Sequence, residues 1–198
     1  MRSLLMIMLT IVLLLPSCSR EQERAPETAG TEQTFFAEIK AQTVKDPNDV
    51  EAWYHLADIY DRSGVYREEA EALQKVIAID PHRGYAYVRL GNTYNRLHQY
   101  QDAINSYTTA IKHFPKDPVL YNNLAISFGK VGRTDDEIIS LQKAVALRPR
   151  YSTARYNLGI ALLRKGKRSE ALAQYHKLDT FDAGVAAALK KEIDRKGK

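Results

Sequence analysis

The chain has 198 residues, of which 44% are hydrophobic, with a formal net charge of +5 and a single cysteine. This length suits one domain with a continuous core. The charge is modest, and no arginine-rich run or platform of stacked aromatic residues is present, so we expect no nucleic-acid partner. A lone cysteine excludes a fold held together by a set of intramolecular disulfides.

The amino terminus has the pattern of an export signal. Residues 4–15 form an apolar run that is broken only by Thr10 and preceded by Arg2. A run of about 12 residues is too short to cross a bilayer, which takes ~20. The run therefore predicts a signal peptide over residues 1–17.

This segment ends in Leu15-Pro16-Ser17-Cys18, which resembles the lipobox of bacterial lipoproteins. In that family the cysteine sulfur carries a diacylglyceryl group, and the amine freed by cleavage is usually acylated. The resemblance implies lipid attachment at Cys18 and a protein anchored in the bacterial cell envelope, facing the periplasm, with Ser19 favouring the outer membrane. The alternatives are ordinary cleavage or a retained hydrophobic anchor, with Cys18 uninvolved.

Two short segments separate this region from the rest of the chain. Residues 18–33 begin with Cys18 and continue with polar residues, a composition typical of a disordered linker. Residues 34–47 predict an N-terminal helix. Its apolar positions are Phe35, Phe36, Ile39 and Val44.

Four prolines spaced 34 residues apart are the most informative pattern: Pro47, Pro81, Pro115 and Pro149. Each interval contains two short helical segments with one apolar stripe each. Gly64, Gly132 and Gly166 stand where a first helix should end, because glycine adopts the left-handed conformation at least steric cost; His98 replaces it once. We therefore expect four helix pairs, at residues 50–83, 84–117, 118–151 and 152–185.

A leucine followed by a small residue recurs in every block: Leu56-Ala57, Leu90-Gly91, Leu124-Ala125 and Leu158-Gly159. The small residue lets the partner helix approach closely, and a larger residue one turn later fills the wedge between neighbouring pairs. Each block then buries its stripe only against the next block. This is the pattern of a solenoid and not of a closed bundle.

These features resemble the tetratricopeptide repeat. Residues 84–115 are the nearest copy, with matching positions at Tyr87, Leu90, Gly91, Tyr94, Tyr100, Ala103, Tyr107, Ala110 and Pro115. Glu69 and Glu137 depart from the family's preferred alanine, and Arg155 stands at an aromatic position. The resemblance covers residues 48–183 and implies an all-α fold, a right-handed superhelix of four helix pairs.

The carboxyl terminus is expected to close this superhelix. Apolar residues recur every four positions at Phe181, Val185, Leu189 and Ile193, and the intervening side chains are largely charged. Residues 184–198 therefore predict a capping helix that is polar on its outer side.

In such a superhelix the first helix of every pair lines the concave side, so the stripe opposite the buried one predicts a binding groove. Its residues are Tyr54, His55, Asp58, Tyr85, Arg89, Asn92, Asn95, Asn122, Asn123, Ile126, Thr153, Tyr156, Asn157 and Ile160. Tyrosines and amides suit an extended segment or a helix of a partner protein. The alternative is an ordinary solvated face.

One cationic residue recurs near the end of every first helix: Arg62, Arg96, Lys130 and Arg164. A cation there complements the helix dipole, and this explains the column without a ligand. A strip that binds an acidic partner is the alternative.

Nothing in the sequence supports catalysis. The five histidines lack the helical zinc-binding spacing, and no phosphate-binding loop, nucleophile elbow or cysteine pair is present, so we expect neither an enzyme nor a cofactor or metal. The favoured function is a lipid-anchored adaptor that binds an envelope protein in its concave groove. The alternative is a structural protein that self-associates and leaves the groove empty.

Overall fold

A computed structural model describes residues 27–195, and the side chains from residue 33 onward. The predicted signal peptide, Cys18 and most of the predicted linker lie outside these residues. Within residues 27–195 the chain forms α-helices and no strand. The helices are α1 (Glu27–Lys45), α2 (Val50–Arg62), α3 (Tyr66–Ile79), α4 (Gly84–Arg96), α5 (Tyr100–His113), α6 (Pro118–Lys130), α7 (Thr134–Leu147), α8 (Ser152–Arg164), α9 (Arg168–Asp179) and α10 (Ala183–Arg195).

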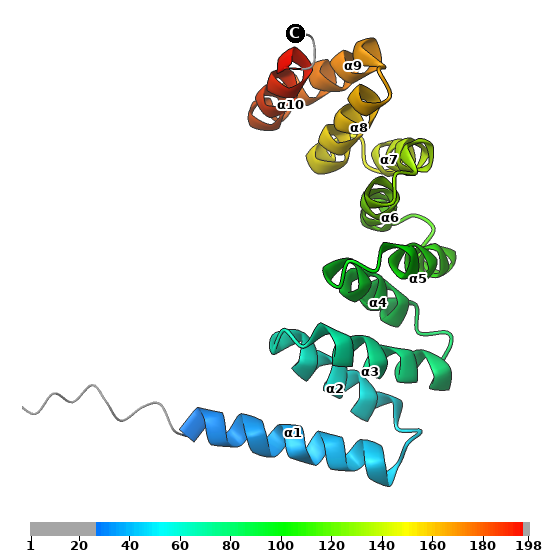
Figure 1. Ribbon diagram of the computed structural model, residues 1–198, viewed down its shortest axis with the longest axis vertical. Coiled ribbons are helices and arrows are strands. Elements are labelled where there is room, and N and C mark those ends of the chain that lie inside the picture. Colours follow the sequence, from blue (N-terminus) through cyan, green and yellow to red (C-terminus); the bar gives the residue numbers. More distant parts are fainter. Residues whose placement is uncertain (1–26, 196–198) are drawn as a thin grey trace, which may run out of the picture.

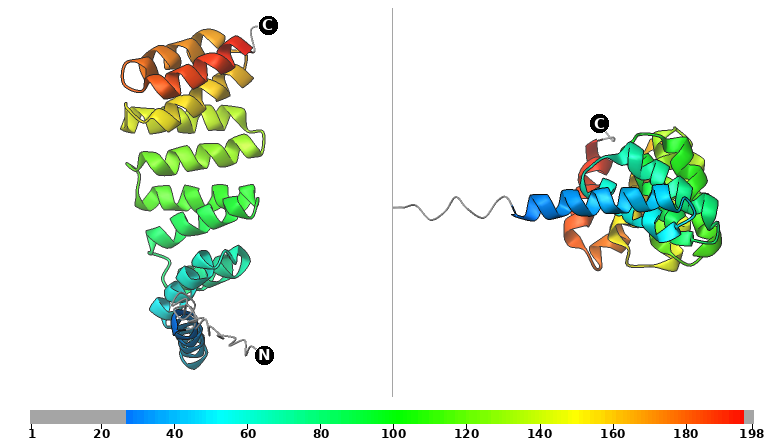
Figure 2. Two further views of the ribbon diagram at one scale, coloured as in Figure 1. Left: turned by 90° about the vertical axis from the view of Figure 1, so that its left-hand side faces the viewer. Right: turned by 90° about the horizontal axis from the view of Figure 1, so that it is seen from below.

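The helices stack in chain order into one elongated, bowed array (Figure 1). Each helix packs on the next, and α8 also packs on α10. The helices cross the array like rungs in the left view of Figure 2, and the chain runs from α1 at one end to α10 at the other. The four predicted pairs, the extra N-terminal helix and the capping helix are all present, which confirms an all-α repeat superhelix.

The first helix is longer than the sequence pattern predicts. It begins at Glu27 and not at Thr34, so the last part of the expected disordered linker, residues 27–33, is helical. Four of these seven residues are glutamate, alanine or glutamine, which have high helix propensity, and the other three are two threonines and Gly30. In the right view of Figure 2, α1 runs across the end of the array and projects beyond it.

The turn inside each pair has the conformation that the sequence predicts. Gly64, Gly132 and Gly166 have φ values of 70°, 79° and 73°, and His98 has a φ of 59°. The left-handed backbone conformation is strained for residues other than glycine. At His98 a ring nitrogen lies 2.7 Å from the Tyr100 hydroxyl, so a local hydrogen bond accompanies the unfavourable backbone.

Close packing within pairs follows the predicted large-beside-small rule. A methyl group added to Gly91 would stand 2.7 Å from the ring of Tyr107, which is 1% exposed. At Gly159 the corresponding neighbour is Leu189 of α10, at 2.6 Å. The capping helix therefore occupies the space that this glycine leaves open.

Arg155 departs from the aromatic pattern of the family but makes a hydrogen bond to the preceding proline. Its Nε donates to the carbonyl of Pro149 at 2.6 Å. Two of the equivalent residues make the same contact, since the Trp53 indole donates to Pro47 O at 2.9 Å and the Tyr121 hydroxyl to Pro115 O at 3.1 Å. In these three repeats an N–H or O–H donor, aromatic or not, satisfies the carbonyl of the preceding proline.

Candidate functional site: the inner face of the superhelix

The first helices α2, α4, α6 and α8 lie on the inner side of the bow, and α5 and α7 lie on the outer side (Figure 1). Spacings of three and four residues place the predicted groove positions on one face of each first helix. We call this face the inner groove. Its side chains divide into a charged part at α2 and α4, an amide part at α4, α6 and α8, and an exposed apolar part.

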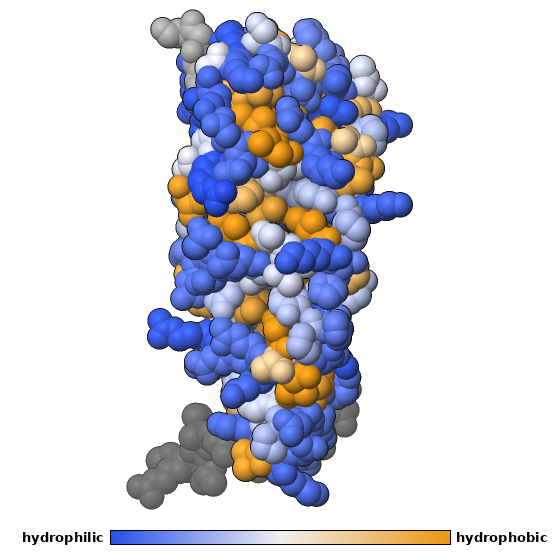
Figure 3. All heavy atoms as spheres, turned by 90° about the vertical axis from the view of Figure 1, so that its right-hand side faces the viewer, coloured by the Kyte–Doolittle hydropathy of each residue, from blue (hydrophilic) through white to orange (hydrophobic). Residues whose placement is uncertain are grey.

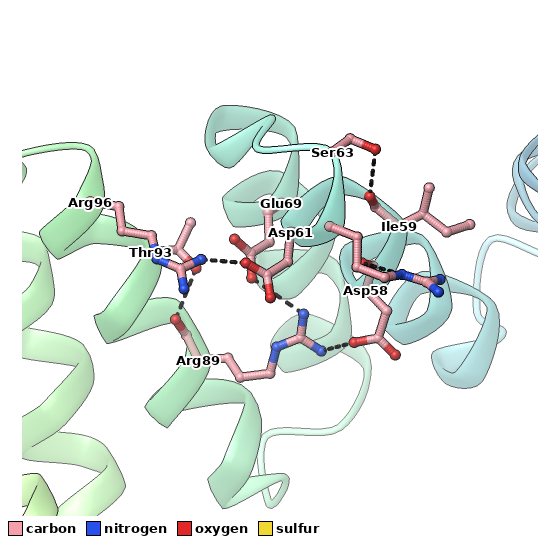
Figure 4. Close-up of polar contacts among 9 residues, drawn as sticks. Asp58, Ile59, Asp61, Ser63, Glu69, Arg89, Thr93 and Arg96 are labelled. Carbon is pink, nitrogen blue, oxygen red and sulfur yellow. Dashed lines mark hydrogen bonds and ion pairs between the residues drawn. The ribbon is translucent and has the colours of Figure 1, made fainter.

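The charged part joins the first two repeats (Figure 4). Arg89 of α4 pairs with Asp58 of α2 and, at 3.3 Å, with Glu69 of α3. Its guanidinium also lies 4.9 Å from the centre of the Tyr54 ring. Three predicted groove residues, Tyr54, Asp58 and Arg89, are therefore brought together, but they bind one another across the repeat boundary.

Glu69 is the buried member of this cluster. It is 2% exposed, and burial raises the pKa of its carboxyl despite the nearby Thr93 and Arg89. One of its oxygens, Oε2, has no hydrogen-bond partner among the described residues. The departure from alanine at this position is thus a buried acid that is held by a cation of the next repeat.

Glu137 repeats the arrangement between the third and fourth repeats. It is 6% exposed, pairs with Arg164 of α8, and has a carboxyl pKa raised by burial. A side chain at Gly129 would come within 2.9 Å of its carboxylate, so this glycine leaves the space that Glu137 fills.

Three of the four recurring cations near the helix ends have specific partners, and Lys130 has no ion pair among the described residues. Arg96 pairs with Asp61 and Arg164 with Glu137, whereas Arg62 donates from Nε to the carbonyl of Asp58 in its own helix at 3.4 Å. Ion pairs between successive repeats place the acid in the earlier repeat and the base in the later one. They are Asp58–Arg89, Glu69–Arg89, Asp61–Arg96, Asp135–Lys165 and Glu137–Arg164.

Between the second and third repeats, hydrogen bonds of amide side chains stand in place of ion pairs. The Tyr107 hydroxyl donates to Asn92 Oδ1 at 2.6 Å and accepts from Asn95 Nδ2 at 3.2 Å. Asn123 Nδ2 donates to Asn92 Oδ1 at 3.4 Å, and Ser127 donates to Asn95 Oδ1 at 2.8 Å. Burial raises the pKa of Tyr107 to about 12, so its hydroxyl stays protonated and keeps donating.

The same chain of amides reaches the fourth repeat through Asn122. Asn157 Nδ2 donates to Asn122 Oδ1 at 3.0 Å, and Asn122 Nδ2 donates to Asn123 Oδ1 at 3.4 Å. Asn122 is 3% exposed, so its amide is a buried link between repeats and is not open to a partner.

The apolar part of the inner groove remains accessible. Tyr85 is 69% exposed, Val119 37% and Ile126 39%. Tyr54, Tyr156 and Ile160 are partly buried, and His55 and Thr153 are exposed. Val119 was missed by the sequence analysis, although it stands 34 residues after Tyr85 and so occupies the same position in the next repeat.

The described part of the chain contains neither a candidate metal site nor a candidate membrane span. Among residues 27–195 no group of three or more histidine, cysteine or acidic side chains could hold a metal ion. Over the same residues, no helix is both long and apolar enough to cross a membrane.

The fold and its inner face define an α-solenoid of helix pairs, and comparisons with known proteins specify the family. Tetratricopeptide repeat profiles match residues 50–83, 84–117 and 122–186, which together exceed half of the chain. The chain belongs to the tetratricopeptide repeat family. Solenoids of this family are generally protein-interaction modules.

Solved structures show the same fold. A crystal structure of MamA is 24% identical, with a TM-score of 0.70, covering 85% of this chain and 94% of that chain. MamA from Desulfovibrio magneticus RS-1, from residue 41 to its end, is 21% identical, with a TM-score of 0.68 and coverages of 83% and 89%. YrrB, described as a tetratricopeptide repeat protein with an unusual peptide-binding site, is 19% identical, with a TM-score of 0.74 and coverages of 83% and 86%. No curated protein matches significantly in sequence.

Proposed function

We propose that the protein is a lipid-anchored scaffold of the bacterial cell envelope that binds a peptide or helix of a partner protein in its inner groove. The observation that carries this proposal is the exposed apolar strip formed by Tyr85, Val119 and Ile126 on α4 and α6. Exposed apolar side chains surrounded by polar groups are typical of protein-interaction sites.

The hydrogen-bonded amides support binding indirectly. Asn92, Asn123 and Asn157 are each held by a neighbouring repeat, so the backbone spacing of α4, α6 and α8 is fixed before a partner arrives. A preformed surface binds at a lower entropic cost than a flexible one. The peptide-binding site named for YrrB, which shares the fold, is consistent with this use of the solenoid.

The anchor rests on the sequence. Residues 1–18 combine a short apolar run with a lipobox-like end at Cys18. Two or three acyl chains attached there would hold the protein at the membrane, since burial stabilises by ~0.8 kcal/mol per methylene. Metabolic labelling with an alkyne fatty acid tests this part. We expect labelled wild-type protein and an unlabelled Cys18→Ser variant, and equal labelling of both would refute the anchor.

The groove is tested with a pair of matched substitutions. Ile126→Asp places a charge in the apolar strip, and Ile139→Asp places the same charge at a 63% exposed isoleucine of α7, on the outer side. We expect Ile126→Asp to abolish co-purification of the partner from native cells, and Ile139→Asp to leave it unchanged. Equal recovery with both variants would contradict groove binding, provided both keep the helical circular-dichroism signal.

A self-assembling structural protein is the second candidate, and α1 provides the observation for it. This helix has the position of a second helix, with no first helix before it among residues 27–195, and it leaves Phe35 and Val44 44% and 76% exposed. Sedimentation of the purified protein distinguishes the two functions. A mass that stays monomeric at all concentrations contradicts self-assembly, whereas an oligomer that Val44→Asp dissociates supports it.

A further inference from the structure

A second candidate interaction surface lies away from the inner groove, in a cleft between α3 and α5. The cleft has a volume of about 340 Å³. Ile77 of α3 and Tyr87, Leu90 and Tyr94 of α4 supply its apolar lining. Gln74, Ala78, Asp102, Asn105, Ser106 and Thr109 complete it. Figure 3 shows the outer side of the array, where hydrophobic patches alternate with hydrophilic side chains.

The repeat pattern explains why the space is open at this boundary. The residues 34 positions after Ala78 and Thr109 are Lys112 and Lys143, and the residue 34 positions after Asn105 is Ile139. By repeat equivalence, lysines stand along the furrow between α5 and α7 at the positions that Ala78 and Thr109 occupy between α3 and α5. The short side chains of Ala78 and Thr109 leave the space between α3 and α5 open.

The acid of the cleft also differs from its equivalents in the third and fourth repeats. Asp136 and Glu170, at the positions equivalent to Asp102, pair with Arg133 at 2.8 Å and Lys167 at 3.0 Å, each three residues earlier. The residue three positions before Asp102 is Gln99, which carries no charge. Within residues 27–195 no ion pair neutralises Asp102, so the single charged group of the cleft lacks a cation.

We propose that this cleft binds a segment of a partner protein that inserts an aliphatic or aromatic side chain and places a lysine or arginine on Asp102. The apolar floor of Ile77, Leu90 and Tyr94 receives the inserted side chain, and the hydroxyl of Tyr94 is held by Gln74 Nε2 at 2.6 Å. The missing cation at Asp102 defines the charge of the occupant by complementarity. The scaffold thereby has two surfaces on opposite sides, which allows it to hold two different segments at once.

The experiment selects a phage-displayed library of random peptides against the full chain and measures the enriched peptides by fluorescence anisotropy. We expect peptides with an apolar residue close to a lysine or arginine. Ala78→Lys, which installs the lysine of the next repeat, should abolish their binding. Asp102→Asn should weaken it about fivefold, as for the loss of an exposed ion pair.

Two control variants make the result specific. Ala146→Lys adds the same side chain at the equivalent exposed position of α7, away from the cleft, and should leave binding unchanged. Ile126→Asp should also leave it unchanged, because it alters the inner groove. Failure of the groove proposal therefore does not affect this test.

Several results would overturn the proposal. The proposal is wrong if the library yields no enriched peptides, or if the enriched peptides carry no lysine or arginine. It is also wrong if the peptides still bind the Ala78→Lys variant or no longer bind the Ile126→Asp variant. A second copy of the chain is the other candidate occupant, and sedimentation tests for it. If Ala78→Lys dissociates an oligomer of the chain, the cleft binds a second copy and the proposal is wrong.

Discussion

The contact between Gly91 and Tyr107 allows a quantitative test of how each helix pair packs. In the second repeat, a methyl group at position 91 would stand 2.7 to 2.9 Å from three ring carbons of Tyr107. The ring cannot easily move, because its hydroxyl is bonded to Asn92 and Asn95. The equivalent pairs are Ala57 with Leu73 and Ala125 with Leu141, so alanine is present where the partner is leucine.

We predict that the effect of Gly91→Ala changes sign with residue 107. In the wild-type background the overlap costs about 1 to 3 kcal/mol and outweighs the ~1 kcal/mol that alanine contributes through helix propensity. In a Tyr107→Leu background the overlap is absent, so Gly91→Ala should stabilise the chain by up to ~1 kcal/mol. The double-mutant coupling energy is then about 2 kcal/mol.

Urea unfolding followed by circular dichroism measures the four chains of this cycle. Gly184→Ala is the control, because the nearest atom to an added methyl there is 3.9 Å away, and it should lack any overlap penalty. Tyr107→Leu alone should destabilise by about 2 to 4 kcal/mol, because it creates a cavity and leaves two amides short of a partner. If Gly91→Ala has the same effect with tyrosine and with leucine at position 107, the packing argument is refuted.

Three further predictions concern other features of the repeats. Burial raises the carboxyl pKa of Glu69 and Glu137, so these groups keep their protons in the native state at pH values where the unfolded chain has lost them. The stabilisation from these two protonated carboxyl groups is full below about pH 4.5 and is lost as the pH rises through the raised pKa values. A chain carrying Glu137→Gln should lose less stability than wild type across that interval in thermal melts at a series of pH values, and parallel curves would contradict the assignment. Arg155→Ala should destabilise by about 2 kcal/mol, because it leaves the Pro149 carbonyl without its donor, whereas Arg155→Trp should retain most of the stability; equal denaturant midpoints for the two variants would show that the donor does not matter. Gly132→Ala should destabilise by about 1 kcal/mol because of its positive φ, and His98→Gly should be neutral or stabilising by a few tenths of a kcal/mol; a stabilising Gly132→Ala would show that the turn does not require a left-handed residue.

The inner groove shows what a sequence pattern leaves undecided. The pattern predicts polar residues on the inner helices and Asn122, Asn123 and Asn157 as part of a partner-binding groove. In the structure these amides bind one another and Asn92 across repeat boundaries. A pattern of side-chain types gives the face on which a residue lies and does not give the partner that its amide chooses.

The departures from the family pattern were visible in the sequence, but their meaning was not. Glu69 and Glu137 read as isolated exceptions to alanine, and only the packed repeats show that Arg89 and Arg164 pair with them. The cleft between α3 and α5 is similar, since the small residues Ala78 and Thr109 form an open space only when both helices are in place.

The sequence by itself determined the repeat length, the boundaries of the helix pairs and the left-handed turns, because these depend on local backbone preferences and on an apolar period within each helix. The tertiary structure decided which polar side chains bind each other, which carboxylates are buried and which apolar residues stay exposed. Those outcomes depend on contacts between residues about one repeat apart, whose distances are fixed only when the neighbouring repeats pack together.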